Sequence, residues 1–247
     1  MLFSVFNRIK RVAARIYNRS SSERFVKYLR SNGVVVGDNV LFREPFTTTI
    51  DMTRPSLITI GHDVDINENF TIMTHDFSNF VFRNYYHDFV SCSGRVTIGN
   101  NIYFGRDVTI LKGVSIGNNC IIGLGSVVTK DIPDNSVACG IPCRVISSLD
   151  DYFKKRKIDQ IDEALDFGVS IIERYNREPN IEDFLEEWCL FLDKDAYDNN
   201  KDIHRIIDFR IRGNKDFFVN RKPYFFNFAE FLQEIRNKYN KKHQNNG

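Results

Sequence analysis

Histidine is the side chain best suited to proton transfer at neutral pH, and this chain of 247 residues contains five histidines. An imidazole has an unperturbed pKa near ~6.5, so its neutral form can take a proton from a hydroxyl group. His75 lies in the segment THDFS, at the point where a regular sequence pattern gives way to an aromatic stretch. His75 is therefore a candidate general base.

The residues that follow His75 offer further chemistry. Asp76 either orients the imidazole, as carboxylates do in catalytic triads, or forms an Asx turn that stabilises a loop. His87 lies in the same stretch, within YYHDF, and is a candidate contact for a substrate. Cys92 is a weak candidate nucleophile, because a reactive thiol needs a neighbouring base and a lowered pKa. We therefore expect proton transfer, rather than attack by a thiol, to be the chemistry of this segment.

A six-residue repeat flanks this segment and must position it. Two rows of residues, mostly apolar, recur at every sixth position: Ile98, Phe104, Ile110, Ile116, Ile122 and Val128, and Ile102, Val108, Val114, Cys120, Ser126 and Ile132. A period of six fits neither a strand nor an α-helix, but it fits a triangular coil whose flat sides are short strands. Gly and Asn at 99–101 and 117–119 suit its tight corners.

The repeat breaks between about residues 73 and 95 and returns at Val96 with its register shifted. The intervening segment must therefore leave the coil, and we expect a loop over residues 76–94. Long excursions from a rigid repeat are usually functional or disordered, and the many aromatic residues of this one argue against disorder.

The regions outside the repeat look helical. Residues 1–32 form a basic amphipathic segment, which either packs on a neighbouring domain or subunit or docks on an anionic membrane surface through residues 1–20. Residues 33–146 form the coil. Residues 147–247 are expected to be an α-helical domain that caps the coil or recognises a polymer, and its segments NIEDFLEEW and NFAEFLQEI look like two equivalent helices with Asn caps. His62 is expected at the surface, and His204 has no predicted role.

Composition excludes several classes of protein. The net charge of +2 argues against nucleic acid as a partner. Five cysteines without a CxxC motif argue against a disulfide framework and against a zinc site, so we expect no metal. No apolar run approaches the ~20 residues of a membrane span. We expect a cytoplasmic protein, either free or peripheral at the inner face of the membrane.

The repeat region, about residues 33–146, is similar to the hexapeptide-repeat acyltransferases. The segment GLGSVVTKDIPDNSVACGIPCRVI, from Gly123 to Ile146, resembles the end of the coil in members that acetylate sugars and bacterial surface polysaccharides. THDFS resembles a segment of the polysaccharide O-acetyltransferases, in which His75 occupies the position of the catalytic base. The resemblance implies a mainly β fold, a left-handed parallel β-helix, with acetyl-CoA as donor and a homotrimer with active sites between subunits.

The resemblance also implies a groove for acetyl-CoA. The residues placed along it are Tyr103, Gly105, Arg106, Gly123, Leu124, Thr129, Lys130 and Arg144. The backbone N–H of Gly105 is expected to stabilise the oxyanion, and Lys130 and Arg144 to bind phosphates. Arg106 departs from the family pattern, in which a small residue often follows the glycine.

Loop 76–94 is expected to bind the acceptor. Its candidate contacts are Asp76, Arg83, Tyr85, Tyr86 and His87. Aromatic faces suit the apolar sides of sugar rings, while tyrosine and arginine can bond hydroxyls or a carboxylate. The alternative is that the aromatic side chains of this loop pack on one another or on a neighbouring subunit.

These expectations together indicate an acetyl-CoA-dependent O-acetyltransferase that uses direct transfer. Its acceptor would be a sugar hydroxyl of a bacterial surface polysaccharide (capsule, O-antigen or exopolysaccharide) or of its precursor. Two alternatives stay open. One is N-acetylation of an amino-sugar nucleotide or an antibiotic, and the other is a non-catalytic β-helical scaffold.

Overall fold

The computed structural model describes residues 2–184, 186–192, 194–199, 207–208, 211 and 222–244. The chain forms two compact units, Met1–Phe153 and Lys154–Gly247, and each has a hydrophobic core of its own. In these described ranges no helix is long and apolar enough to cross a bilayer. His204 lies outside them.

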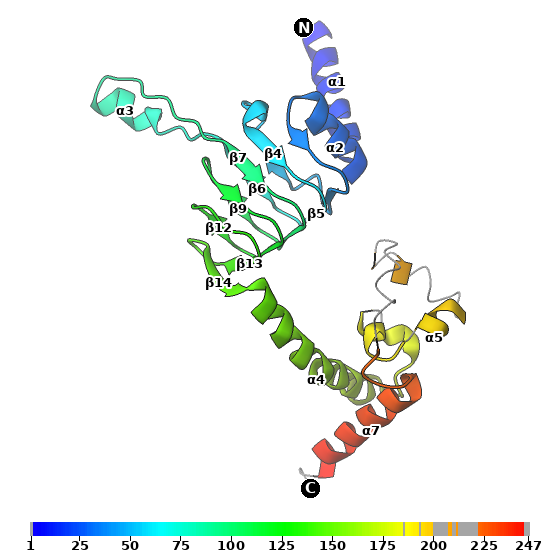
Figure 1. Ribbon diagram of the computed structural model, residues 1–247. Coiled ribbons are helices and arrows are strands. Elements are labelled where there is room, and N and C mark those ends of the chain that lie inside the picture. The colour runs from blue at the N-terminus through cyan, green and yellow to red at the C-terminus, as the bar shows by residue number, and fades with distance from the viewer. Residues whose placement is uncertain are drawn as a thin grey trace. The chain divides into compact units, whose positions relative to one another are not determined.

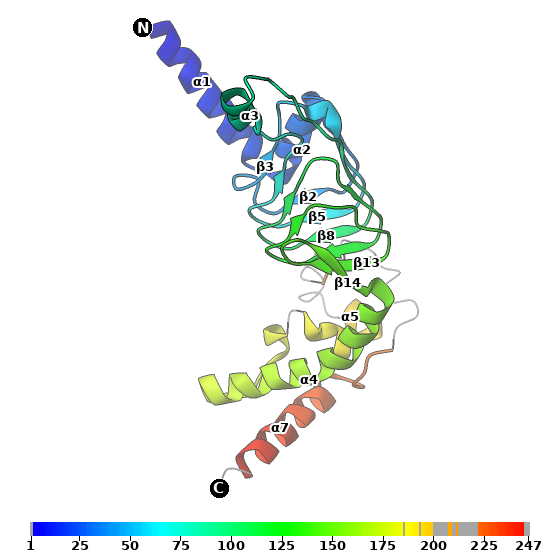
Figure 2. The ribbon, with the colours of Figure 1, turned by 90° about the vertical axis from the view of Figure 1, so that its left-hand side faces the viewer.

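The first unit contains the expected left-handed parallel β-helix, whose three sides are sheets (Figures 1 and 2). The first sheet contains β1 (Val35–Val36), β4 (Ile58–Ile60), β7 (Val96–Ile98) and β10 (Ser115–Ile116). The second contains β2 (Leu41–Phe42), β5 (Val64–Ile66), β8 (Ile102–Phe104), β11 (Cys120–Ile122), β13 (Ser136–Cys139) and β14 (Arg144–Ser148). The third contains β3 (Thr49–Ile50), β6 (Thr71–Ile72), β9 (Thr109–Ile110) and β12 (Val127–Val128).

Successive coils stack strand on strand in parallel register. Ile60 pairs with Ile98 in the first sheet, and Ile72 pairs with Ile110 in the third. These four side chains point into the coil and are buried. The six-residue rows of the sequence are therefore the core of the β-helix, and the antiparallel strand β14 ends the second sheet beside β13.

The chain turns at three corners, which we number by the sheets that they join. The first corner connects the first sheet to the second, the second corner connects the second sheet to the third, and the third corner leads back to the first sheet of the next coil. At the first corner the side chain of one coil accepts a backbone N–H from the coil before it. His62 Nδ1 accepts from Asp38 at 3.0 Å, and Asn118 Oδ1 accepts from Asn100 at 2.9 Å. Asn101 and Asn119 have a φ of 55°, which explains why Asn recurs there.

Glycine at the first corner allows the coils to approach closely. A Cβ added to Gly61 would lie 2.4 Å from the carbonyl oxygen of Gly99, which is far inside van der Waals contact. A Cβ added to Gly99 would likewise lie 2.7 Å from the carbonyl oxygen of Gly117. The column of glycines is therefore a condition for stacking.

The N-terminal segment forms two helices, α1 (Leu2–Arg19) and α2 (Ser22–Ser31). The apolar face of α2 covers the open end of the coil, where Phe25 meets Phe42 with their ring centroids 4.9 Å apart. Repeat arrays need such a cover at their ends. A 3₁₀ turn, η1 (Pro55–Leu57), leads into β4.

The excursion between β6 and β7 is an arm that Figure 1 shows projecting from the coil. We define the arm as residues 77–91, and it contains the short helix α3 (Asn79–Tyr85) where the sequence predicted a loop. Two contacts close its base. The N–H of Gly94 donates to the carbonyl of Thr74 at 2.9 Å, and the N–H of Asp76 donates to Cys92 Sγ at 3.3 Å.

The second unit is helical around an aromatic core. Its elements are α4 (Leu149–Tyr175), which begins in the first unit, η2 (Ile181–Asp183), η3 (Glu187–Leu190), α5 (Lys194–Asn199) and α7 (Phe228–Gln244). The predicted equivalence of its two Asn-capped segments is wrong. Asn227 opens the α-helix α7, whereas Asn180 opens only a 3₁₀ turn. The chain leaves that turn at Phe184, whose ring is buried in the aromatic core.

Candidate active site

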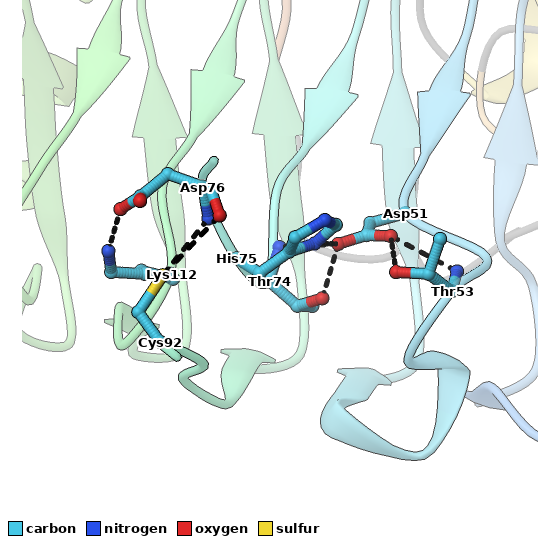
Figure 3. Close-up of polar contacts among 7 residues, drawn as sticks. All are labelled: Asp51, Thr53, Thr74, His75, Asp76, Cys92 and Lys112. Atoms are coloured by element: carbon cyan, nitrogen blue, oxygen red, sulfur yellow. Dashed lines mark hydrogen bonds and ion pairs between the residues drawn. The ribbon is translucent and has the colours of Figure 1, made fainter. Parts of the chain in front are cut away.

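An imidazole and a carboxylate from neighbouring coils meet at the third corner. His75 Nδ1 lies 2.5 Å from Asp51 Oδ2 (Figure 3). The His75 side chain is 26% exposed, whereas that of Asp51 is only 5% exposed. The buried carboxylate thus engages one ring nitrogen of a partly accessible imidazole and leaves Nε2 for chemistry.

Asp51 accepts hydrogen bonds from three residues. Thr53 donates its N–H and hydroxyl to Oδ1 at 3.1 and 2.6 Å, and Thr74 donates the same two groups to Oδ2 at 3.1 and 2.5 Å. Burial alone would raise the pKa of Asp51, but the hydrogen bonds from Thr53, Thr74 and His75 outweigh it and hold that pKa well below its ordinary value of 3.8. Asp51 is therefore an acceptor at neutral pH. The Nδ1 of His75 must then carry the proton, and Nε2 is free to accept one.

Stacking of β3 on β6 explains why these residues meet. Ile50 pairs with Ile72 in the third sheet, and the N–H of Asp51 donates to the carbonyl of Ile72 at 3.1 Å. Asp51 directly follows β3, and His75 lies three residues after the end of β6, so both lie at the third corner, one coil apart. The position of the dyad is set by the sheet and not by the arm.

Asp76 is turned toward Lys112 and not toward the imidazole (Figure 3). Its carboxylate forms an ion pair with Lys112 Nζ and accepts the N–H of Ser78 at 3.0 Å. The hydrogen bond from Lys112 is the main reason that the pKa of Asp76 is lowered, and the same bond raises the pKa of Lys112. Of the roles predicted for Asp76, the structure shows the Asx turn.

Cys92 contributes to the same base of the arm. Besides accepting the N–H of Asp76, its sulfur lies against Lys112, and this contact also favours the charged form of that lysine. The base of the arm is therefore held by three side chains, those of Asp76, Cys92 and Lys112, where the chain leaves the coil and returns to it. This is a structural task, as expected for a thiol without a neighbouring base.

Three of the residues predicted to contact the acceptor, Arg83, Tyr85 and Tyr86, pack on other side chains of the arm. The Arg83 guanidinium lies 5.0 Å from the centroid of the Phe80 ring. Tyr85 and Tyr86 are exposed and meet edge to face, with their ring centroids 4.7 Å apart. His87 ends the helical turn with a φ of 54°. These side chains form an exposed aromatic and cationic surface at a distance along the chain from His75.

The predicted donor residues fall at two different corners. Gly105 and Arg106 follow β8, and Gly123 and Leu124 follow β11, so all four lie at the second corner. Their apolar member, Leu124, is 76% exposed. The remaining corner residues, Thr129 and Lys130, follow β12 and are exposed at the third corner, in the same column as His75. One chain thus places His75 and much of the predicted groove on different edges of the triangle.

One predicted role is wrong. The N–H of Gly105 already donates to the carbonyl of Ile122 at 2.8 Å, because Gly105 continues the ladder of the second sheet. It is therefore not available for an oxyanion. The glycine is required for a steric reason instead, since a Cβ there would lie 2.6 Å from the backbone nitrogen of Leu124.

The other predicted donor contacts lie at the surface of the second sheet and its corner. Arg106 Nη2 is paired with Glu68 Oε1 at 3.2 Å. The Tyr103 hydroxyl accepts from Asn67 Nδ2 at 3.1 Å. Arg144 is exposed at the start of β14. Arg106 would have to leave Glu68 before it could bind a phosphate.

Sequence reasoning missed Asp51 and Lys112. Asp51 follows Ile50, which continues the inward column of Val36 and Phe42 in the first coil. The step from Phe42 to Ile50 is eight residues instead of six, and this insertion hid the register. The sequence showed only that Lys112 follows β9 at the third corner, one coil after the arm. It gave no sign that Lys112 pairs with Asp76.

The geometry as a whole suits general-base chemistry on a hydroxyl. It provides a carboxylate-bound imidazole at an accessible edge, next to an arm that carries aromatic groups. In the part of the chain that the structure describes, no three His, Cys, Asp or Glu side chains are grouped so that they could hold a metal ion.

Comparison with known proteins gives matches over the coil. Residues 95–130 match the family described as bacterial transferase hexapeptide (six repeats). Galactoside O-acetyltransferase of Escherichia coli (strain K12) is 36% identical over 158 residues, which are 61% of this chain and 74% of that protein. Protein CapG of Staphylococcus aureus is 37% identical over 147 residues, which are 60% of this chain and 83% of that protein.

Solved structures match the same region. One is a galactoside acetyltransferase in complex with coenzyme A, which has 31% identity and a TM-score of 0.42 over 58% of this chain and 80% of that one. Another is a maltose O-acetyltransferase from Clostridium difficile 630, with 29% identity and a TM-score of 0.38 over 55% of this chain and 81% of that one.

Proposed function

Because the chain belongs to the hexapeptide-repeat acetyltransferase family and is an acyltransferase, we propose that it acetylates a sugar hydroxyl with acetyl-CoA as donor. The acceptor is a bacterial surface polysaccharide or its precursor, and the reaction takes place in the cytoplasm. The relative named galactoside O-acetyltransferase supports a sugar hydroxyl as acceptor. The likeness of THDFS to the polysaccharide O-acetyltransferases supports a polymer or its precursor.

The contact between Asp51 and His75 carries this proposal. With Nδ1 held by the carboxylate at 2.5 Å, Nε2 takes the proton of the attacking hydroxyl. The oxygen attacks the thioester carbonyl, the tetrahedral oxyanion collapses, and the CoA thiolate leaves and receives the proton from the imidazolium. The products are the sugar acetate ester and CoA. Asp51 is a positioning residue in this scheme, because it acts through the imidazole.

We assign donor binding to the residues of the predicted groove. The pantetheine arm lies along the backbone of the second corner, where Gly105 and Gly123 follow β8 and β11. The exposed cations Arg106, Lys130 and Arg144 are the candidate partners of the CoA phosphates. Tyr103, Leu124 and Thr129 supply the remaining walls. The arm, with Arg83, Tyr85, Tyr86 and His87, contacts the acceptor, while Asp76 fixes its base.

A homotrimer would bring the two corners together. The base lies at the third corner, and most of the donor groove lies at the second. In a closed threefold ring of parallel coils, the second corner of one chain can face the third corner of the next. The site would then be complete only between subunits, which supports the trimer that the resemblance implies.

Replacement of His75 tests the reaction. We expect His75→Gln to lower the rate of CoA release at least ~10²-fold, as for other general bases. The matched control is His243→Gln in α7, an exposed histidine of the second unit, which should keep the native rate. A His75→Gln enzyme with near-native turnover, and with the circular dichroism spectrum of the wild type, would contradict the assignment.

A panel of acceptors tests the substrate class. Polysaccharide fragments, neutral sugars and amino sugars would be offered with acetyl-CoA, and the products analysed by mass spectrometry and mild alkaline hydrolysis. An alkali-labile acetyl ester supports the proposal. An alkali-stable amide would replace it by N-acetylation, and an absence of CoA binding in calorimetry would favour a scaffold.

A further inference from the structure

The apolar row of α1 is exposed, although that of α2 is buried. The side chains of Ile9, Val12 and Ile16 are 60%, 52% and 54% exposed. They are three, four and seven positions apart, so they share one face of the helix. In α2, by contrast, Phe25 and Leu29 are 0% exposed because they cover the end of the coil. Two amphipathic helices thus follow each other in the chain, and only the second has its apolar face covered.

The sequence of α1 also gives it a uniform charge. Residues 2–19 contain five cations, Arg8, Lys10, Arg11, Arg15 and Arg19, and no Asp or Glu. On a helix with 3.6 residues per turn, Arg15 falls at the flank of the apolar row and Arg11 lies beyond it on the polar face. An apolar face bordered by arginine is the pattern of helices that lie in a membrane interface.

The C-terminal end of α1 is attached to the coil. Arg19 Nη1 donates to the carbonyl of Thr48 at 2.7 Å, and its guanidinium lies 4.7 Å from the centroid of the Phe25 ring. The ring of Tyr17 stacks with the guanidinium of Arg24 at 4.4 Å. These contacts occupy the last turn and leave the row from Ile9 to Ile16 uncovered.

We propose that α1 docks on the surface of an anionic lipid bilayer, with Ile9, Val12 and Ile16 in the interface and the arginines against lipid phosphates. Charge selects this occupant. A second copy of α1 would bring another set of cations beside the first with no carboxylate between them, and like charges repel. An anionic bilayer supplies both the apolar layer and the opposite charge. This inference does not depend on the acetyl transfer reaction.

Vesicle sedimentation tests the proposal on the full-length protein. We expect binding to vesicles of phosphatidylcholine with phosphatidylglycerol and little binding to phosphatidylcholine alone, with a loss at high salt. Arg11→Gln/Arg15→Gln should weaken binding by about thirty-fold, the loss expected for two cations near an anionic surface. Ile9→Ser/Ile16→Ser should weaken it at least as much. Lys155→Gln/Lys157→Gln, which removes two exposed cations from α4, is the matched control and should bind as the wild type does.

Other outcomes would overturn the proposal. If either α1 variant binds anionic vesicles as the wild type does, the surface is not the lipid contact. If Ile9→Ser/Ile16→Ser instead lowers the molecular mass measured by light scattering, the apolar row is a contact between copies of the chain. Circular dichroism of each variant shows whether the fold is intact.

Discussion

The imidazole of His75 depends on a carboxylate that belongs to the preceding coil. Asp51 is nearly buried and accepts five hydrogen bonds, so its orientation is fixed before a substrate arrives. A fixed carboxylate sets both the tautomer and the plane of the ring. The precision of the proposed base therefore comes from Thr53 and Thr74 as much as from Asp51.

Asp51→Asn should reduce catalysis through His75. The NH₂ group of an asparagine cannot accept the hydrogen bonds that one carboxylate oxygen of Asp51 now accepts. The side chain would therefore no longer hold the imidazole of His75 in its orientation. We expect kcat to fall at least ~10²-fold with a smaller change in the KM for acetyl-CoA. In the His75→Gln background the same substitution should cost little more, because positioning residues act through the base. Additive losses in this double-mutant cycle would contradict the assignment.

The pKa of Asp51 also predicts how stability depends on pH. Because the folded-state pKa lies below the ordinary value of 3.8, the unfolded chain binds the proton first as the pH falls. The contribution of Asp51 is thus present above about pH 4 and is lost as the pH falls toward its folded-state pKa. Urea unfolding should show a gap in stability between wild type and Asp51→Asn that narrows below about pH 4. A gap that stays constant from about pH 6 to about pH 2 would be inconsistent with a lowered pKa.

At the scale of elements, the coil is held by contacts between equivalent positions of successive turns. Carbonyl-to-glycine approaches and side-chain bonds of His62, Asn100 and Asn118 recur at the first corner. Each contact depends on the position of the neighbouring coil along the axis of the β-helix. A change at one corner is therefore felt by the coils on either side.

Gly61→Ala should destabilise the β-helix strongly. Its Cβ would lie 2.4 Å from the Gly99 oxygen and 2.5 Å from Asn100 Oδ1, and both belong to the packed corner. We expect a loss of about 1–3 kcal/mol or more in the free energy of unfolding, as for overpacked sites. Thr97→Ala, at an exposed outward position of β7, is the control and should change stability little. Equal stability of the two variants would show that the corner can relax.

The regular elements of the coil were predictable, and the irregular ones were not. Residues 96–132 follow the six-residue rule without interruption, so their inward rows and corners could be located from the sequence. The first coil contains an insertion between Phe42 and Ile50, so the register that brings Asp51 to His75 was hidden. The hydrogen bond of Gly105 could not be foreseen from residue types either, because every backbone N–H has the same chemistry in a sequence.

The whole molecule has two separate hydrophobic cores, and the proposed site draws on two different corners of the coil. The core of the coil and that of the helical unit share no residue. Within the coil, the second and third corners are different edges of a triangle. Closed association of coils is the simplest way to place donor and base together.

Mixed trimers test this arrangement. His75→Gln removes the base at the third corner, and Leu124→Glu puts a negative charge at an exposed position of the second corner. We expect each variant alone to be inactive, and a refolded equal mixture to recover about a quarter of wild-type activity, since one interface in four then combines two intact corners. Light scattering should show three chains per particle in every sample. No recovery from mixed trimers would place the whole site within one chain.

The contacts at the base of the arm have a consequence for how the acceptor preference of such an enzyme could change. Asp76 meets Cys92, and Thr74 meets Gly94, before the chain resumes its winding. The strands above and below therefore keep their pairing whatever lies between these contacts. Residues 77–91 are in this sense an insertion whose sequence can vary without changing the coil. A designer could exchange it for another segment to alter selectivity while His75 stays in place beside Asp51.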